Sequence, residues 1–310
     1  MKACHIYINE PDHDFDRALA AEAERVAEES TKQGFPFAIR MRYARGNERT
    51  QWQQIQDDRK VDPHPDLVIV IPVNHEAVYD ILYETVNTRP GVTCVFLHQT
   101  RTKMHHSERA EYKTRLFSVG ADQVEIGRLQ ARQFASILPD RRGDVIYIQG
   151  RENSFGTKGR MKGLLEELPK TPDIKLNGFR VFGDWTGPSV RPAIDSWTQL
   201  GGKLAWIKAA GAQNDAMALA LVDLLREQGL ALPVIGVDGV EAGRQGVDRG
   251  ALTATVIQPL GVGHAMRVYR DLLGGTLQPD AIPDSGNIVL PPESYPPLAT
   301  LEKRVRPGAS

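Results

Sequence analysis

The sequence predicts an α/β protein made of two Rossmann-like, doubly wound lobes, each built on a parallel sheet. Short apolar runs of strand length alternate with amphipathic helical segments along nearly the whole chain. About ten such runs fall into two similar series, which suits two sheets covered by helices better than one large sheet. The length of 310 residues also exceeds that of one average domain.

The first series opens with a strand at 4–8. A helix follows, because apolar side chains recur there at the spacing of one helix face, at Phe15, Leu19, Ala23, Val26 and Ala27. Asp122 is a natural amino-terminal cap for the last helix of the series, from 123 to 136. The other expected strands are 37–43, 66–71, 93–97 and 115–119, with helices near 48–57 and 74–87.

The second series repeats the alternation. Its expected strands are 144–150, 174–183, 204–210, 233–237 and 252–257, and its helices are 156–168, 188–200 and 215–228. A proline-rich tail begins at Pro279 and contains one more expected strand, at 287–290.

Composition excludes several classes of partner. The net charge of −1 and the pI near 6.7 argue against nucleic acid. Mean hydropathy is −0.35, and apolar runs such as 67–73 are far shorter than a membrane span, so we expect no direct membrane insertion. Cys4 and Cys94 lie in expected strands that a third strand would separate, which argues against a disulfide.

Three polar residues end three apolar segments of the second series: Asn214, Asp238 and Gln258. In an open α/β sheet, the carboxyl edge of the strands is where small ligands bind. Hydrogen-bonding side chains that arrive there from consecutive strands describe a polyol or sugar pocket. No nucleophile–base pair accompanies them, so we do not expect an enzyme.

Each of the three residues also has a structural explanation. Asn214 opens a helix and could cap it, Asp238 precedes a glycine as in many turns, and Gln258 could be a linker residue before Pro259. The ligand interpretation accounts for all three at once. It predicts that Asp215 caps the helix while Asn214 points toward the ligand.

The order of these motifs, QNDAMA, then VDG, then a strand ending in Gln-Pro, resembles the periplasmic sugar-binding protein family, and its ribose-binding branch in particular. The resemblance implies the type I periplasmic binding protein fold, whose chain crosses between lobes three times. The crossings would fall near 119–122, 258–260 and 284–287. The lobes would comprise residues 1–121 plus 259–285 and residues 122–258 plus 286–310, with a ligand cleft between them and a three-segment hinge.

The resemblance also implies further ligand contacts. Trp185 follows an expected strand, and its aromatic plane could cover the apolar face of a sugar ring. Phe15 matches an aromatic residue that covers the opposite ring face in the family. Lys158 matches a basic ligand contact, whereas Arg160, in the Arg-x-x-Gly pattern that follows, would be structural. The alternatives without a ligand are purely structural: Trp185 would be a half-buried aromatic residue packed on a loop, and Phe15 would pack in the core.

The first lobe departs from the ribose-binding pattern. His98 and Gln99 stand where that pattern has an Asp-Arg pair, Ile71 replaces an asparagine, and Ala121 replaces a serine beside Asp122. We therefore list His98, Gln99 and Asp122 as ligand-binding candidates but do not expect ribose itself. A different sugar, a deoxy or amino sugar, or a related polar metabolite fits better.

No cofactor or metal is expected. The loop after residue 150 has the wrong glycine and lysine spacing for a phosphate loop. His105 and His106 are adjacent, near Glu108, and do not form a spaced set of metal ligands.

The resulting functional expectation is a substrate-binding protein that delivers a sugar to the permease of an ATP-driven importer, as a monomer in the periplasm. The chain as written shows no signal peptide, so a cytoplasmic location is the expectation if Met1 is the true start. The alternative is a cytoplasmic ligand sensor of the lactose-repressor-like fold that lacks a DNA-binding domain and signals through another protein.

Overall fold

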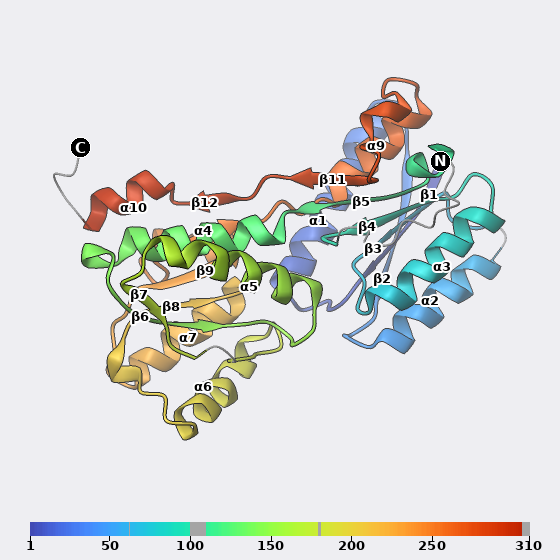
Figure 1. Ribbon diagram of the computed structural model, residues 1–310. Helices are drawn as coiled ribbons and strands as arrows, with labels where there is room; N and C mark the ends of the chain where they lie inside the picture. The colour runs from blue at the N-terminus through green and yellow to red at the C-terminus, as the bar shows by residue number, and fades with distance from the viewer. Residues whose placement is uncertain (62, 100–109, 179–180, 306–310) are drawn as a thin grey trace. The chain divides into compact units, whose positions relative to one another are not determined.

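The computed structural model describes residues 1–61, 63–99, 110–178 and 181–305. The backbone separates into two compact units. The first unit comprises Met1–Ala121 and Leu260–Leu290, and the second comprises Asp122–Pro259 and Pro291–Ser310. Each unit contains one sheet of six strands with helices on both faces (Figure 1).

The sheet of the first unit is entirely parallel and has the strand order β11-β5-β4-β3-β1-β2. Helices α1 and α9 pack together on one face, and α2 and α3 pack together on the other (Figure 1). Every residue of β3 and β4 is buried, as expected for central strands of a parallel sheet covered on both faces. The elements are β1 (Lys2–Ile8), α1 (Asp14–Lys32), β2 (Phe37–Tyr43), α2 (Glu48–Lys60), β3 (Leu67–Val70), α3 (His75–Thr88), β4 (Thr93–Leu97), β5 (Leu116–Ala121), α9 (Val262–Leu273) and β11 (Asn287–Leu290).

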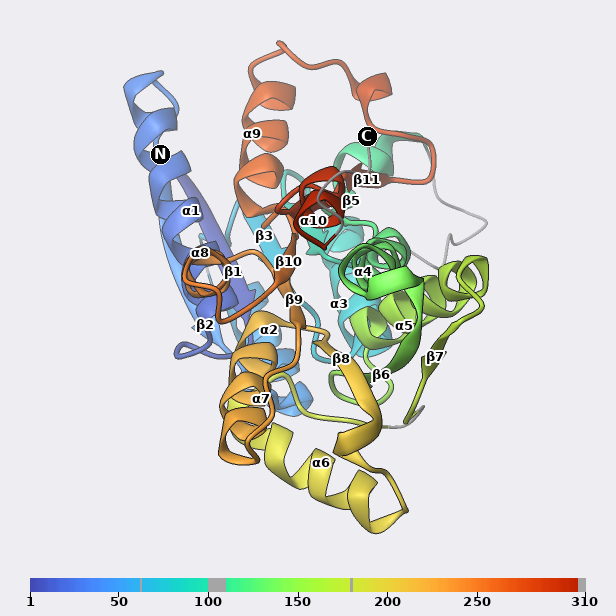
Figure 2. The same ribbon diagram turned by 90° about the vertical axis from the view of Figure 1, so that its left-hand side faces the viewer.

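The sheet of the second unit has the order β12-β10-β9-β8-β6-β7, and all its strands are parallel except the edge strand β12. Successive side chains of β6 enter different cores: Ile146 packs with α6 and α7, and Tyr147 packs with α4 and α5. Figure 2 shows these two helix pairs on either side of the strands. The elements are α4 (Gln123–Ile137), β6 (Gly143–Ile148), α5 (Phe155–Glu167), β7 (Ile174–Leu176), α6 (Val190–Gln199), β8 (Ile207–Ala212), α7 (Asp215–Glu227), β9 (Val234–Asp238), α8 (Glu241–Asp248), β10 (Ala254–Ile257), β12 (Glu293–Tyr295) and α10 (Leu298–Val305).

Two glycines allow α4 and α5 to approach closely. A Cβ atom on Gly127 would lie 1.9 Å from the carbonyl oxygen of Arg160, and one on Gly163 would lie 1.8 Å from that of Val124. No side chain fits at either position, so the backbones of α4 and α5 are in direct contact. This contact fixes the amino-terminal end of α4, which begins at Gln123, beside the turn of α5 that carries Arg160.

The structure differs from the predicted elements in several places. The expected strand 174–183 shortens to β7, with an isolated bridge between Gln149 and Phe182, and part of it lies outside the described residues. The start of the expected strand 204–210 is a short 3-10 helix. Elements α8, α9, α10 and β12 were not predicted. The third boundary between units follows Leu290 rather than 285, because β11 pairs in parallel with β5 and so stays in the first unit.

Both cysteines are buried and free, as predicted. Cys4 on β1 and Cys94 on β4 are separated by β3, which pairs with both strands. Among the described residues, no helix is long and apolar enough to span a membrane.

A buried carboxylate in the first unit gives a prediction for acid stability. Asp58 is 2% exposed and accepts hydrogen bonds from His5 (2.9 Å), Tyr7 (2.6 Å) and Arg42. Burial alone would raise the pKa of Asp58, but the hydrogen bonds from Arg42, Tyr7 and His5 outweigh it and lower the pKa from 3.8 to about 2. A folded-state pKa below the unfolded one means that the carboxylate stabilises the fold above pH 3.8, and that this stabilisation is lost between about pH 4 and pH 2.

We therefore expect Asp58→Asn to remove about 2 kcal/mol of the difference in unfolding free energy between pH 7 and pH 2. Urea unfolding of both proteins across this range measures it. Equal acid sensitivity of the wild type and the variant would contradict the assignment.

Candidate functional site

Asn214 lies two residues after the end of β8 and caps α7. It is 1% exposed; its side-chain oxygen accepts a hydrogen bond from the Met217 amide (3.0 Å), and its nitrogen donates to the carbonyl of Trp185 (2.7 Å). The expectation that Asp215 caps this helix and Asn214 does not is therefore wrong. Asn214 both caps the helix and fixes the backbone of the loop that carries Trp185.

Asp215 turns into the interior of the second unit instead. Its carboxylate accepts hydrogen bonds from the Gly239 amide (2.9 Å) and the Thr255 hydroxyl (2.6 Å). Glycines on β9 and α8 make room for it, since a Cβ on Gly236 or Gly243 would lie within 2.2 Å of a carboxylate oxygen. Asp215 thereby ties the loop after β9 to β10.

Asp238 and Gln258 lie side by side at the carboxyl ends of neighbouring strands. Asp238 ends β9, and Gln258 follows β10. The backbone N–H of Gln258 donates to the backbone carbonyl of Asp238 (3.1 Å). Both residues are buried, with 7% and 5% exposure. The structure therefore brings together two of the three polar strand-end residues, and Asn214 lies at the end of the next strand in the sheet, β8.

Arg160 joins these strand ends into one network. It donates to the side-chain oxygens of Gln123 (2.9 Å) and Gln258 (2.6 Å) and to the carbonyl of Gln213. Its guanidinium also lies 4.0 Å from the carboxylate of Asp238. From the sequence, Arg160 was expected to be structural, and Gln123 was not among the expected site residues. The available signal was the Arg-x-x-Gly spacing, because Gly163 brings α4 against the turn that holds Arg160.

Trp185 covers the network from a loop. Its ring lies 5.3 Å from the Arg160 guanidinium carbon, in a cation–π arrangement. A Cβ on Gly150 would lie 2.2 Å from the indole, so this glycine provides the surface on which the ring rests. Gln213 holds that glycine by accepting from its amide (2.9 Å). The indole is half-buried, which leaves part of it open to contact.

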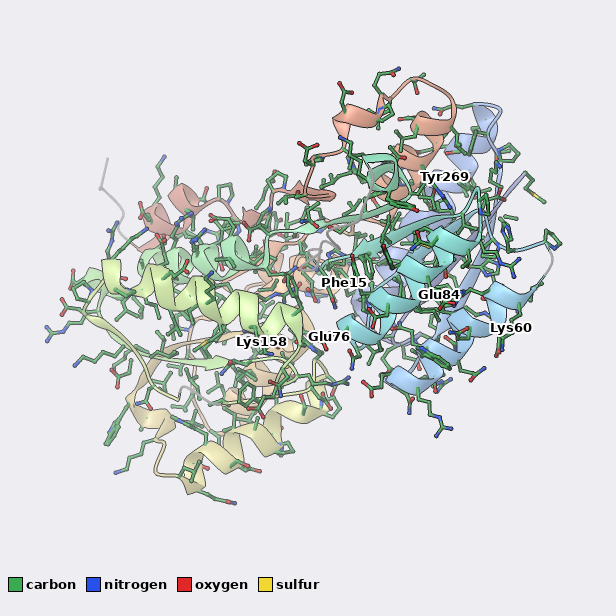
Figure 3. All side chains as sticks on the ribbon, turned by 45° about the vertical axis from the view of Figure 1, so that its right-hand side comes forward. Phe15, Lys60, Glu76, Glu84, Lys158 and Tyr269 are labelled. Carbon is green, nitrogen blue, oxygen red and sulfur yellow. The ribbon has the colours of Figure 1, made fainter. Side chains whose placement is uncertain are left out.

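Lys158 lies apart from this network. It is exposed on α5 (Figure 3) and lines an open hollow with Glu152, Asn153, Lys162 and Phe182. Lys158 and Arg160 are two residues apart on a helix and therefore point to different sides. The structure thus gives the buried basic position to Arg160, and the expected ligand contact of Lys158 stays a prediction.

Asp122 precedes α4 and caps it as predicted, accepting hydrogen bonds from the amides of Val124 (2.9 Å) and Glu125 (3.1 Å). A ligand contact of its carboxylate, expected from the resemblance, stays a prediction.

The first unit has its own polar cluster at the carboxyl edge of its sheet. The rings of Phe15 and His98 pack edge to face, 5.2 Å apart, and His98 Nε2 donates to the Leu260 carbonyl (2.7 Å). Gln99 donates to the Pro72 carbonyl (3.2 Å), and its side-chain oxygen is buried without a hydrogen-bond partner among the described residues. The same is true of the side-chain oxygen of Asn9, directly after β1, which the sequence analysis overlooked. This edge therefore offers two buried acceptors.

Backbone strain marks three of the expected site residues. His98 (φ 58°), Trp185 (φ 78°) and Asp238 (φ 109°) have left-handed φ values without being glycine. Only seven non-glycine residues of the described chain do so, and such conformations cost about 1–3 kcal/mol each. Strain of this kind concentrates at functional sites, so it independently points to these three residues.

The charged groups of the network influence one another. Burial and the neighbouring carboxylate of Asp238 raise the pKa of Asp215 well above 3.8. Burial lowers the pKa of the Arg160 guanidinium, and the charge of Asp238 opposes that shift. The network therefore places one arginine cation 4.0 Å from the carboxylate of Asp238.

Metal binding finds no support in the described part of the chain, where no group of three or more His, Cys, Asp or Glu side chains could hold an ion. His105 and His106 lie outside the described residues.

The chain matches the periplasmic binding protein domain over residues 6–275. It belongs to the periplasmic binding protein family. This match covers nearly the whole chain and confirms the resemblance inferred from the motifs, and the family consists of binding proteins rather than enzymes.

Comparison with individual proteins agrees. The xylitol-binding protein of Mycolicibacterium smegmatis is 30% identical over 142 residues, 46% of this chain and 40% of that protein. The aligned segment thus spans less than half the length of this relative. A periplasmic solute-binding protein of an ABC transporter from Actinobacillus succinogenes, with bound D-allose, has a TM-score of 0.77 at 18% identity, covering 95% of this chain and 97% of that one. The fructose-binding periplasmic domain of the hybrid two-component system BT1754 has a TM-score of 0.75 at 19% identity, covering 97% and 93%. Both structural matches confirm the type I fold.

Proposed function

We propose that this chain is the solute-binding component of an ATP-driven importer and binds an uncharged sugar or polyol. The observation that carries the proposal is the network at the carboxyl edge of the second unit. Asp238 and Gln258 supply hydrogen-bonding groups side by side, and Trp185 supplies an apolar plane beside them. Rings or chains rich in hydroxyls match such a surface, because hydroxyls satisfy the polar groups while C–H faces cover the indole.

The charges of the site favour a neutral ligand. Asp238 already faces the Arg160 cation at 4.0 Å, so a ligand need not supply a compensating charge. The relatives support a sugar or polyol, since one is described as binding xylitol and another was observed with D-allose. Closure of the units about a hinge stays a prediction, as does a monomeric state.

The second candidate is a sensor that reports a sugar to a partner protein. The structural similarity to a fructose-binding domain of a two-component system favours it, because that domain has the same fold in a signalling protein. Both candidates use the same ligand site, and they differ in the protein that recognises the ligand-bound form.

A thermal-shift screen tests the proposal. The panel contains xylitol, D-allose, D-fructose, D-ribose and myo-inositol, with gluconate and glucosamine as charged controls. A ligand at 100 times its Kd adds about 2.7 kcal/mol to the stability of the native state, equivalent to about 5–10 °C in Tm. We expect a shift of this size with one or a few neutral members. A response confined to the charged controls, or no response to any member, would contradict the proposal.

Trp185 gives a separate prediction. We expect Trp185→Ala to weaken binding of the solute found in the screen by about tenfold, since aromatic contacts of this kind contribute on the order of 1 kcal/mol beyond the buried area. The unfolding midpoint should change little, because the indole is only half-buried. Titration calorimetry measures the affinity. Trp206→Ala, at an indole 54% exposed elsewhere in the same unit, is the control and should bind normally.

A further inference from the structure

The side-chain oxygen of Gln258 is fully engaged inside the protein. It accepts from Arg160 Nη2 (2.6 Å) and from Gln123 Nε2 (3.1 Å). A guanidinium carries only donors, so the Gln258 atom that faces it must be the oxygen. The orientation of this amide therefore follows from its neighbour.

The side-chain nitrogen of Gln258 is not used in this network. It forms no hydrogen bond with the described residues, and it carries two N–H donors. Beside it, Asp238 carries a carboxylate, which is an acceptor only when ionised. The two neighbouring strand ends thus present opposite hydrogen-bond polarity.

Arg160 is itself held in place by its three hydrogen-bond partners. Its side chain is 5% exposed, and each nitrogen of the fork donates to a different group, on Gln123, Gln213 and Gln258. A lysine would retain the positive charge but could not reproduce these three directions. The arginine thus acts on Gln258 by geometry as well as by charge.

We propose that Arg160 is a positioning and specificity-determining residue that locks Gln258 as a pure hydrogen-bond donor toward the solute. This inference rests on the proposed function and refines its ligand class. The solute needs a free hydroxyl that donates to Asp238, and next to it an oxygen that accepts from Gln258. An ether oxygen of the solute is sufficient to accept from Gln258. A solute that lacks the hydroxyl donating to Asp238 is not bound.

The first arm of the test needs no ligand. In a ¹H–¹⁵N spectrum, the side-chain amide pair of Gln258, assigned by its absence in Gln258→Glu, should be dispersed in the wild-type protein. In Arg160→Lys it should move to the position of a freely rotating glutamine. Arg128→Lys is the control, because Arg128 forms half-exposed ion pairs with Glu125 and Glu166 on the same helices. An amide pair that stays unchanged in Arg160→Lys, in a folded protein, would overturn the proposal.

The second arm measures binding of the best solute of the screen panel by calorimetry. Gln258→Glu keeps an oxygen toward Arg160 but replaces the donor by an acceptor. We expect its Tm to be at least that of the wild type and its affinity to fall at least about tenfold, as for a lost hydrogen bond with an unpaired group left behind. Gln199→Glu, on the exposed end of α6, should bind normally. Undiminished affinity in Gln258→Glu would overturn the proposal.

The two claims fail in different ways. If the wild-type protein binds no member of the panel, the proposed function fails, and the spectrum alone decides whether Arg160 orients Gln258. If the wild type binds and Gln258→Glu binds equally well, the proposed function stands and the inference about Arg160 fails.

Discussion

Asp238→Ala is expected to weaken solute binding at least about 30-fold, which corresponds to about 2 kcal/mol for hydrogen bonds to a charged group. Asp238 ends the strand beside Gln258, and its carboxylate lies 4.0 Å from the Arg160 guanidinium. Its loss removes the acceptor that the proposed solute hydroxyls require. Titration calorimetry with the best solute of the screen measures the effect.

The backbone at Asp238 calls for a second variant. Its φ of 109° is strained for any residue with a side chain, and asparagine tolerates positive φ better than alanine. Asp238→Asn keeps the shape and one acceptor but loses the charge, so we expect an intermediate loss, about tenfold, in a fully folded protein. Asp223→Ala, exposed on α7, is the control. If Asp238→Ala and Asp238→Asn both bind within threefold of the wild type, the site assignment is wrong.

Gly163→Ala is expected to have the largest effect on stability. Its Cβ would lie 1.8 Å from the carbonyl oxygen of Val124, which is backbone and cannot move without displacing α4 from α5. Overpacking of this kind costs about 1–3 kcal/mol. The displacement would also separate Gln123 on α4 from Arg160 on α5 and so weaken solute binding. Urea unfolding followed by circular dichroism measures the first effect, and calorimetry the second.

Gly156→Ala is the matched control, since it lies on the same helix. A Cβ there would meet its nearest neighbours at 3.6 Å, which is an ordinary contact. Alanine is also the better helix former, so its stability should equal or slightly exceed that of the wild type. Equal stabilities of Gly163→Ala and Gly156→Ala would show that the close approach of α4 and α5 does not contribute to the fold.

Most of the fold could be predicted from the order of apolar runs. Both sheets are buried on both faces, so their strands are short continuous apolar segments, such as 67–70 and 93–97, that stand out between amphipathic helices. The order of apolar runs could not predict the unit to which a strand belongs when only its pairing partner determines it. β11 has an ordinary strand sequence, and only its pairing with β5 assigns it to the first unit.

The candidate site was predictable as far as its strand ends. Asp238 and Gln258 were found because each follows a buried strand, and the network joins them. The roles of Asn214 and Asp215 were exchanged, because both residue types cap helices equally well. The choice depends on Gly236 and Gly243, distant in sequence, which leave room for the Asp215 carboxylate.

Arg160 was expected to be structural, but its hydrogen-bond partners could not be predicted, for a related reason. Its place in the network depends on the contact between α4 and α5, which two glycines permit and which local sequence does not reveal. An Arg-x-x-Gly pattern on a helix that follows a strand is a useful signal for such a contact, because the glycine lies one turn away on the same face.

The central claim is that a neutral sugar or polyol binds against Trp185 at the carboxyl edge of the second sheet. An NMR titration with the best solute of the screen, following the indole N–H signals, tests it most directly. We predict a saturable change in the Trp185 signal, assigned with Trp185→Phe, while the signals of Trp52 and Trp206, which are 41% and 54% exposed, stay in place. Saturable binding that leaves the Trp185 signal unchanged would contradict the account.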